Sequence, residues 1–134
     1  LTLILCDIDR FKQVNDNYGH DGGDIALKHV ADLFKETIRE QDGVARWGGE
    51  EFLFVLPTTN ENNGVVLAEK IRETLQSTPV PIKNTSLTIT ASFGVAQIHL
   101  ENGLNNALSL ADKALYRAKE NGRNKVLSAS SLAP

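Results

Sequence analysis

Two adjacent acids, Glu50 and Glu51, follow a pair of glycines in the stretch G-G-E-E-F at 48–52. Apolar residues flank this stretch at 44–47 and 52–56, which predicts a β-hairpin. A two-residue glycine loop suits such a hairpin, because positive φ angles cost glycine little. We therefore expect both carboxylates to lie on a rigid turn.

A further acidic group is expected at the end of a buried strand. The largely apolar run at 1–6 leads directly into Asp7, Ile8 and Asp9, and such a run is typical of a strand buried on both faces. Singly, each acid is explained more simply as a solvated charge. If the strand and the hairpin are neighbours, however, the clustered carboxylates repel one another and require a hard cation, Mg²⁺ or Mn²⁺, which also binds phosphates.

The composition is typical of one compact domain. The chain has 134 residues, 41% of them hydrophobic, which is enough for one core. Its net charge of −3 argues against bulk attraction to nucleic acid, and its apolar runs are too short to insert into a membrane. Cys6 is the only cysteine, so we expect no intrachain disulfide and a cytoplasmic domain. Segments outside this chain could still anchor a longer protein to a membrane.

The periodicity of apolar residues predicts helices packed on a sheet. Helical spacing is found within 27–38, 67–75 and 104–118. Strands are expected at 1–8, 44–47, 51–56, 86–90 and 91–98, the last two forming a hairpin after Pro79 and Pro81. Such a combination indicates an α+β fold, and we expect a frayed end at 128–134.

Three motifs together resemble one family. G-G-E-E-F is similar to the signature of the GGDEF domain of bacterial diguanylate cyclases, with Glu50 in place of the aspartate. The stretch 7–24, D-I-D-x-F-K-x-x-N-D-x-Y-G-H-x-x-G-D, resembles the segment before that signature, and A-K-x-x-G-R-N at 118–124 resembles its closing motif. The resemblance implies one domain over 1–134 with a ferredoxin-like core, shared with nucleotide cyclases and polymerase palms, and a mostly antiparallel mixed sheet flanked by helices.

The resemblance implies that two GTP molecules are condensed into cyclic di-GMP with release of pyrophosphate. Asp7, the main-chain carbonyl of Ile8 and Glu50 would be ligands of Mg²⁺ or Mn²⁺, with Glu51 assisting. Glu50 is also the family's usual acceptor of the hydroxyl proton, although a carboxylate beside a metal is a weak base.

Basic residues are implied around the phosphates. Lys12 would lie over them, beside main-chain donors at Arg10 and Phe11. Lys119 and Arg123 are four residues apart near the end of a predicted helix, and the resemblance assigns them to the triphosphate. The simpler alternative is that both cations favour a helix C-terminus, with Gly122 as its cap.

Asn15, His20 and Asp24 are implied around the guanine base. Asn15 and Asp24 suit the donors at N1 and N2 of guanine, whereas only the motif points to His20. The alternative for Asn15 and Asp24 is helix capping, because Asp24 stands just before the apolar stripe that begins at Leu27.

Arg39 and Asp42 match an R-x-x-D pattern five residues before the signature. At this offset the pattern resembles an inhibitory product site, where Arg39 would bind guanine or phosphate of cyclic di-GMP and Asp42 a guanine edge. The alternative is a charged end of a helix.

Catalysis on two GTP molecules implies a homodimer, because one domain has room for one GTP. The chain has no methionine and opens within a predicted strand, so we expect it to be truncated at its N-terminal edge. Family members usually carry an upstream helix and sensor or regulatory domains. Two alternatives stay open, a regulatory module that binds GTP or cyclic di-GMP without turnover, and a relative that makes a different cyclic dinucleotide.

Overall fold

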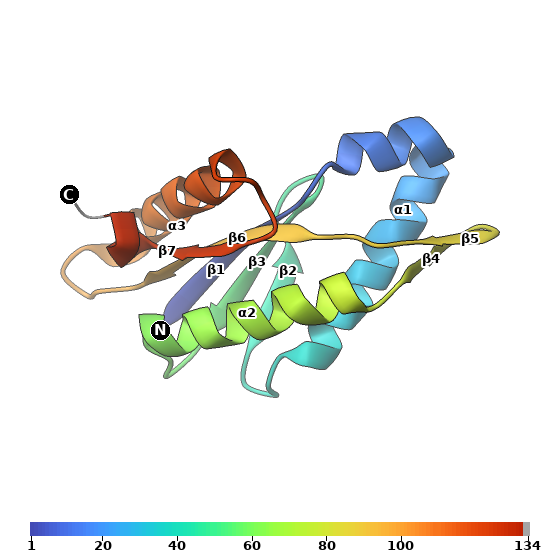
Figure 1. Cartoon of the computed structure of the whole chain (residues 1–134). Helices are drawn as coiled ribbons and strands as arrows, with labels where there is room; N and C mark the ends of the chain where they lie inside the picture. The colour runs from blue at the N-terminus through green and yellow to red at the C-terminus, as the bar shows by residue number, and fades with distance from the viewer. Residues whose placement is uncertain (133–134) are drawn as a thin grey trace.

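The computed structural model describes residues 1–132. Three helices and seven strands follow one another along the chain (Figure 1). In chain order they are β1 (Thr2–Ile8), α1 (Phe11–Thr37), β2 (Gly43–Arg46), β3 (Glu51–Leu56), α2 (Glu61–Ser77), β4 (Val80–Ile82), β5 (Thr85–Leu87), β6 (Ala91–Gln97), α3 (Gly103–Glu120) and β7 (Val126–Ser128), before a short 3₁₀ helix (Ala129–Leu132).

Five strands form the main sheet in the order β2-β3-β1-β6-β7. All neighbours are antiparallel except β6 and β7, which are parallel. The path β1-α1-β2-β3-α2-β6 is ferredoxin-like, with the β4–β5 hairpin inserted before β6 and with α3 and β7 appended. The predicted α+β fold with a mostly antiparallel mixed sheet is confirmed.

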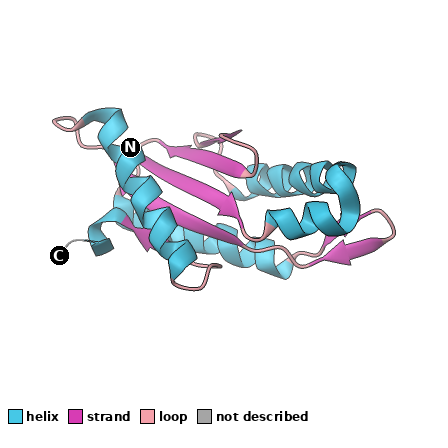
Figure 2. Cartoon of the chain, turned by 90° about the horizontal axis from the view of Figure 1, so that it is seen from above, coloured by secondary structure: helices cyan, strands magenta, loops and turns pink. Residues whose placement is uncertain are grey.

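Strand β1 lies at the centre of the molecule, with all seven residues buried. One face of the sheet packs against α1 and α2, and the other against α3 (Figure 2). Ile4 and Cys6 belong to the core between the sheet and helices α1 and α2, whereas Leu3 and Leu5 belong to the core beneath α3. The predicted burial of this strand on both faces is confirmed, so its last residues hold their position firmly.

Helix α1 begins sixteen residues before the predicted apolar stripe, at Phe11. It bends at Gly19, whose φ of 77° and ψ of 171° are not helical. Gly23 lies after this bend and lets the part of the helix before it pack closely. A Cβ at Gly23 would lie 1.9 Å from Asn15 Oδ1 and 3.0 Å from Phe11 Cζ. Glycine has a low helix propensity, which explains why the sequence pattern missed this part.

The predicted hairpin between 86–90 and 91–98 is wrong. Strand β5 pairs with β4, and these two form a separate small sheet. Val80 and Ile82 are buried in the α1–α2 core while Pro81 between them is exposed, so the alternating pattern of β4 holds this hairpin on the helices. Part of the segment expected to fray forms the end of β7 and the 3₁₀ helix, and 133–134 lie outside the described residues.

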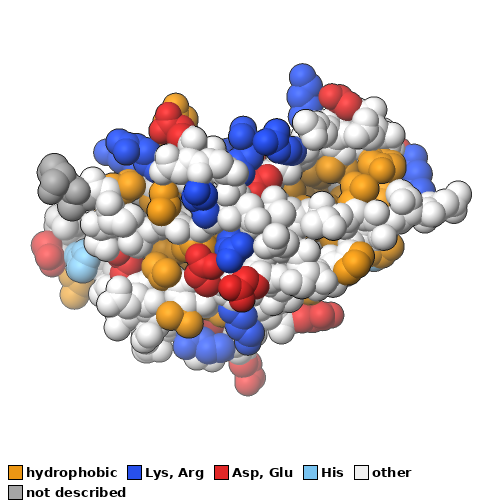
Figure 3. All heavy atoms as spheres, viewed as in Figure 1, with side chains coloured by type: hydrophobic (Ala, Val, Ile, Leu, Met, Phe, Trp, Pro, Cys, Tyr) orange, Lys and Arg blue, Asp and Glu red, His pale blue; other side chains and the backbone are white. Residues whose placement is uncertain are grey.

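Charged side chains of both signs are interspersed over the face shown in Figure 3. Within residues 1–132, no helix has both the length and the apolar character of a membrane-spanning segment.

Gly94 of β6 gives the most sensitive test of the packing. A Cβ at this position would lie 2.0 Å from the carbonyl oxygen of Ala111 and 2.5 Å from the amide nitrogen of Leu115, both main-chain atoms of α3. We expect Gly94→Ala to lower the free energy of unfolding by about 3 kcal/mol, because the whole helix must shift. Urea denaturation measures this, with Gly43→Ala, which meets no atom within 4 Å, as the control. Equal stabilities of the two variants would contradict the packing.

Candidate functional site

The end of β1 and the turn between β2 and β3 meet at one edge of the sheet. Asp7 is paired directly with Glu51 across the β1–β3 ladder. The amide of Ile8 donates a hydrogen bond of 3.1 Å to the carbonyl oxygen of Glu50. The three acids singled out in the sequence are therefore brought together by main-chain pairing.

The turn itself differs from the prediction. Strand β2 ends at Arg46 and β3 begins at Glu51, so the loop has four residues, and neither Gly48 nor Gly49 has a positive φ. The amide of Trp47 closes the turn by donating to the Glu51 carbonyl oxygen at 2.7 Å. Arg46 stabilises it further, because its Nε lies 3.2 Å and 3.0 Å from the carbonyl oxygens of the two glycines.

The carboxylates are partly withdrawn from water and repel one another. Asp7 is only 6% exposed. Burial raises the pKa of Glu50 and that of Glu51, and the negative charge of Asp7 raises both further. Lys119 acts in the opposite direction, and its Nζ lies 2.6 Å from Asp7 Oδ2. One lysine thus partly compensates three clustered acids.

A cavity of about 150 Å³ opens beside this cluster, at the start of α1. Main-chain amides in the first turn of a helix have no acceptor within the helix, so they are available to an anion. Arg10, just before the helix, has a left-handed φ of 56°. All the residues that line the cavity except Asp9 were predicted as site residues: Asp7, Ile8, Arg10, Phe11, Lys12, Glu50, Lys119 and Arg123.

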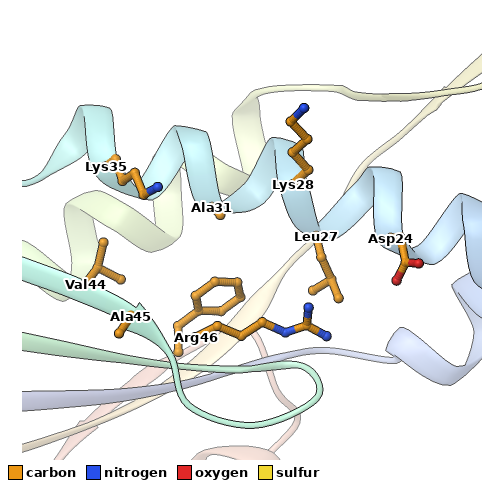
Figure 4. Close-up of a pocket in the computed structure, with 9 residues that line it drawn as sticks. Asp24, Leu27, Lys28, Ala31, Lys35, Val44, Ala45 and Arg46 are labelled. Carbon is orange, nitrogen blue, oxygen red and sulfur yellow. The ribbon is translucent and has the colours of Figure 1, made fainter.

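A second cavity, of about 450 Å³, lies between α1 and the β2–β3 hairpin. Figure 4 shows Leu27 pointing from α1 towards the guanidinium of Arg46. Asp24 lies on the same helix, on the other side of Leu27 from Ala31 and Lys35. Asn15 and Asp24 both lie within α1, so the alternative that they cap helix ends is wrong. Asn15 contacts the helix at Gly23, next to Asp24, whereas His20 is exposed and lines neither cavity.

Comparisons with known proteins identify the family. The family model described as "Diguanylate cyclase, GGDEF domain" matches residues 1–125. This chain belongs to the GGDEF family. Diguanylate cyclase A of Treponema denticola (strain ATCC 35405) is 40% identical over 129 residues, which cover 94% of this chain and 34% of that protein. The chain thus spans about a third of the length of this relative.

Solved structures of GGDEF domains have the same fold. The GGDEF domain of DgcB from Caulobacter crescentus, solved in complex with c-di-GMP, has a TM-score of 0.90 at 32% identity, covering 96% of this chain and 77% of that one. The active GGEEF domain of a diguanylate cyclase from Vibrio cholerae has a TM-score of 0.82 at 36% identity, covering 96% and 81%. The ferredoxin-like, palm-type core expected from the sequence is confirmed.

In this GGDEF domain, Arg39 and Asp42 bind each other. Arg39 Nε donates to Asp42 Oδ2 and Nη2 to Oδ1, both at 2.9 Å, and the Arg39 amide adds a bond of 3.0 Å. The Asp42 side chain is fully buried while that of Arg39 is 46% exposed. Burial acts to raise the pKa of Asp42, but the hydrogen bonds from Arg39 outweigh it and lower that pKa. Arg39 also donates to Thr59 Oγ1 at 2.7 Å, a partner that the motif did not reveal.

Two more residues of the GGDEF domain were missed. Asp9 accepts three hydrogen bonds from two distant segments of the chain, and Arg46 holds the signature turn. Asp9 stands at the end of a buried strand, which was a usable signal for a structural carboxylate. The spacing of Arg46 relative to the glycines gave no such signal, because the contact depends on the shape of the turn.

The donor set of the GGDEF domain suits a hard cation. Carboxylate oxygens of Asp7 and Glu50 face the same cavity, and their repulsion would be relieved by a divalent ion. Among the described residues, no three His, Cys, Asp or Glu side chains are grouped as a complete metal site. A cation bound here would therefore also need main-chain or ligand oxygens, as the predicted Ile8 carbonyl implies.

Burial of Glu50, together with repulsion from Asp7, leads to a prediction about stability. Because the pKa of Glu50 is raised in the folded state, its ionisation destabilises the fold, and this loss grows as pH rises from about 4 through the raised pKa. We expect Glu50→Gln to raise the melting temperature at pH 7 by on the order of a degree or two, and to have little effect below pH 4. Thermal unfolding monitored by circular dichroism measures this, with the exposed Glu101→Gln as the control. A lower melting temperature for Glu50→Gln at pH 7 would contradict it.

Proposed function

We propose that this GGDEF domain condenses two GTP molecules into cyclic di-GMP. The observation that carries the proposal is a cavity at the start of α1, which brings acids, cations and helix amides together. This combination suits a phosphoryl transfer, in which positioning and charge stabilisation do most of the work. In each of the two steps, a 3′ oxygen forms a bond to the α-phosphorus of the other GTP, and the bond to pyrophosphate breaks.

Asp7, Glu50 and the Ile8 carbonyl would hold Mg²⁺ or Mn²⁺, with Glu51 assisting. Such a cation, when bound, neutralises charge on the phosphate oxygens. Glu50, on the turn, is the residue to which we assign the proton of the attacking hydroxyl. Glu50 lines the same cavity as Asp7 and Lys12, so its position and not its basicity supports this assignment.

Positive groups from three segments would hold the triphosphate. Lys12 and the amides of Arg10 and Phe11 come from the start of α1, whereas Lys119 and Arg123 come from the end of α3 and the loop after it. Lys119 already pairs with Asp7, so it lies where negative charge gathers. The alternative of simple helix-end cations accounts less well for this convergence.

The guanine base would lie at the second cavity. Asp24 lines this cavity and offers an oxygen acceptor for the N1 and N2 donors of guanine, and Leu27 offers an apolar surface. Asn15 lies beside Gly23, next to Asp24, and would supply a second acceptor. His20 is assigned to the base by the family motif alone, and its side chain is exposed. An acceptor pair of this kind also disfavours adenine, which lacks the N1 donor.

Two copies of the domain would have to face each other, each contributing one GTP. A homodimer is therefore part of the proposed mechanism, and activity should rise with protein concentration.

Removal of the turn carboxylate tests the activity. We expect the wild-type domain, dimerised through a fused coiled coil and given GTP and Mg²⁺, to form cyclic di-GMP detectable by mass spectrometry. Glu50→Ala should lower the rate about 100-fold or more, since it removes both a metal ligand and the proton acceptor. Glu101→Ala, outside the cavity, is the matched control. GTP binding without product in the wild type would instead favour a regulatory module, and an active Glu50→Ala would refute the assigned role.

The product would inhibit the enzyme at Arg39. Its guanidinium is held in place by Asp42 and Thr59 but remains half-exposed, so an edge is available to a guanine or a phosphate. Both oxygens of Asp42 accept from Arg39. We therefore assign Asp42 first to positioning Arg39, and its contact with a guanine edge stays a prediction.

Loss of inhibition is the readout for this site. Arg39→Ala should retain turnover and weaken inhibition by cyclic di-GMP at least about tenfold, but it leaves Asp42 buried without its partner and should cost about 1–3 kcal/mol of stability. The double variant Arg39→Ala/Asp42→Ala removes that buried charge, so it should regain stability while remaining insensitive to product. Initial rates at increasing cyclic di-GMP measure the effect. Unchanged inhibition in both variants would exclude the site.

A further inference from the structure

We propose that Asp9 is a positioning residue for nucleotide binding, which holds the loop after α3 so that Arg123 faces the cavity. The inference rests on the proposed function, because it takes the ligand of Arg123 to be a nucleotide phosphate. Asp9 is the one lining residue of that cavity to which the motifs assigned no role.

Asp9 accepts three hydrogen bonds from residues far away in the sequence. Thr90 Oγ1 donates to Oδ2 and Ser92 Oγ to Oδ1, both at 2.7 Å. The main-chain amide of Asn124 donates to Oδ2 at 2.9 Å. The Asp9 amide in turn donates to the Thr90 carbonyl oxygen at 2.9 Å. The two hydroxyls therefore fix the carboxylate, and the carboxylate fixes the loop.

The loop needs such a partner because its backbone is strained. Gly122, Arg123 and Asn124 have φ values of 111°, 64° and 47°. The left-handed region is unfavourable for residues with a side chain, although asparagine tolerates it better than arginine does. Such conformations persist where the surroundings impose them, and a hydrogen bond to a charged acceptor is among the stronger ways to do so. Without Asp9, we expect the loop to relax and Arg123 to leave the cavity.

Asn124 is also held from its other side. Arg72 of α2 donates from Nη1 to Asn124 Oδ1 at 3.2 Å, and Arg72 is itself fixed by two bonds of 2.9–3.0 Å to Glu69 Oε2. The amide of Arg123 donates to the Ala118 carbonyl oxygen at 3.0 Å. Arg72 thus holds the side chain of Asn124, whereas Asp9 holds its main-chain amide, directly after Arg123.

The hydrogen bonds of Asp9 indicate which variants distinguish a positioning role from direct ligand binding. Asparagine at position 9 could keep the geometry, because its carbonyl oxygen can accept from Asn124 and Thr90 while its amide donates to the Ser92 hydroxyl. A group that bound a cation or needed its charge would lose function in Asp9→Asn as fully as in Asp9→Ala. The two variants therefore distinguish the two roles.

The test compares two ligands that differ only in their phosphates. The affinities of the whole domain for 3′-deoxy-GTP, which has no attacking hydroxyl, and for 3′-deoxyguanosine are measured by NMR titration. We expect Asp9→Ala to weaken 3′-deoxy-GTP binding about tenfold and to leave 3′-deoxyguanosine binding within about twofold. Asp9→Asn should stay close to the wild type for both ligands. Equal weakening of both ligands, or no weakening, would overturn the inference.

A double-variant cycle checks that Asp9 acts through Arg123. Arg123→Ala should weaken 3′-deoxy-GTP binding in the wild type but add little in the Asp9→Ala background. If Arg123→Ala has the same effect in both backgrounds, the inference fails while the proposed phosphate role of Arg123 stands. If it has no effect in the wild type, both fail.

Asp9→Ala could lower stability, so a milder change keeps the test decisive. Thr90→Val is nearly isosteric and removes one of the two hydroxyls that orient the carboxylate. We expect the same selective loss of 3′-deoxy-GTP affinity, about threefold. A variant that binds both ligands like the wild type would count against the inference.

Discussion

Negative charge gathered at the end of a buried strand is the constraint on which the rest of the structure depends. Asp7 is fixed there by strand pairing on both sides, and the adjacent turn brings Glu50 and Glu51 to the same edge. Desolvation and repulsion make this arrangement costly in the absence of positive charge. Lys119 supplies part of that charge from the last turn of α3. The position of α3 on the sheet is therefore tied to the electrostatics of the site.

The scaffold resists relaxation of this cluster. Strand β1 is buried on both faces, and the main chain of α3 approaches β6 closely at Gly94. Phe34 of α1 packs against Phe52 and Phe54 of β3, with ring centroids 5.1 Å and 5.2 Å apart. The side chains of β3 thus anchor the strand that begins at Glu51. Rigid packing of this kind allows acids to be held closer together than they would lie in a flexible loop.

Sequence patterns predicted the elements whose formation depends on residues close together in the chain. The apolar run of β1, the acids after it and the hairpin around the glycines could all be read from neighbouring residues. The first part of α1 could not, because glycines that disfavour an isolated helix are required by contacts such as that between Gly23 and Asn15. The pairing of β5 with β4 likewise depends on Val80 and Ile82 entering the helical core, which spacing alone does not reveal.

The same limit applies to the site. Asp7, Glu50 and the basic residues were singled out by type and motif, and the structure brings them to one cavity. Asp9 was not assigned a role, because its partners lie 81 to 115 positions away in the sequence. The contact of Arg39 with Thr59 also joins separate segments. Long-range hydrogen bonds of this kind follow from the topology and cannot be deduced from the spacing of a motif.

Mn²⁺ binding, followed by electron paramagnetic resonance, tests the carboxylate cluster most directly. Asp7→Asn keeps the shape of the buried side chain and removes its charge, and Asp32→Asn on the exposed face of α1 is the matched control. We expect the wild type and Asp32→Asn to bind Mn²⁺ equally, and Asp7→Asn to bind it at least about tenfold more weakly. Equal Mn²⁺ affinity in Asp7→Asn and the wild type would contradict the assignment of this cluster as a cation site.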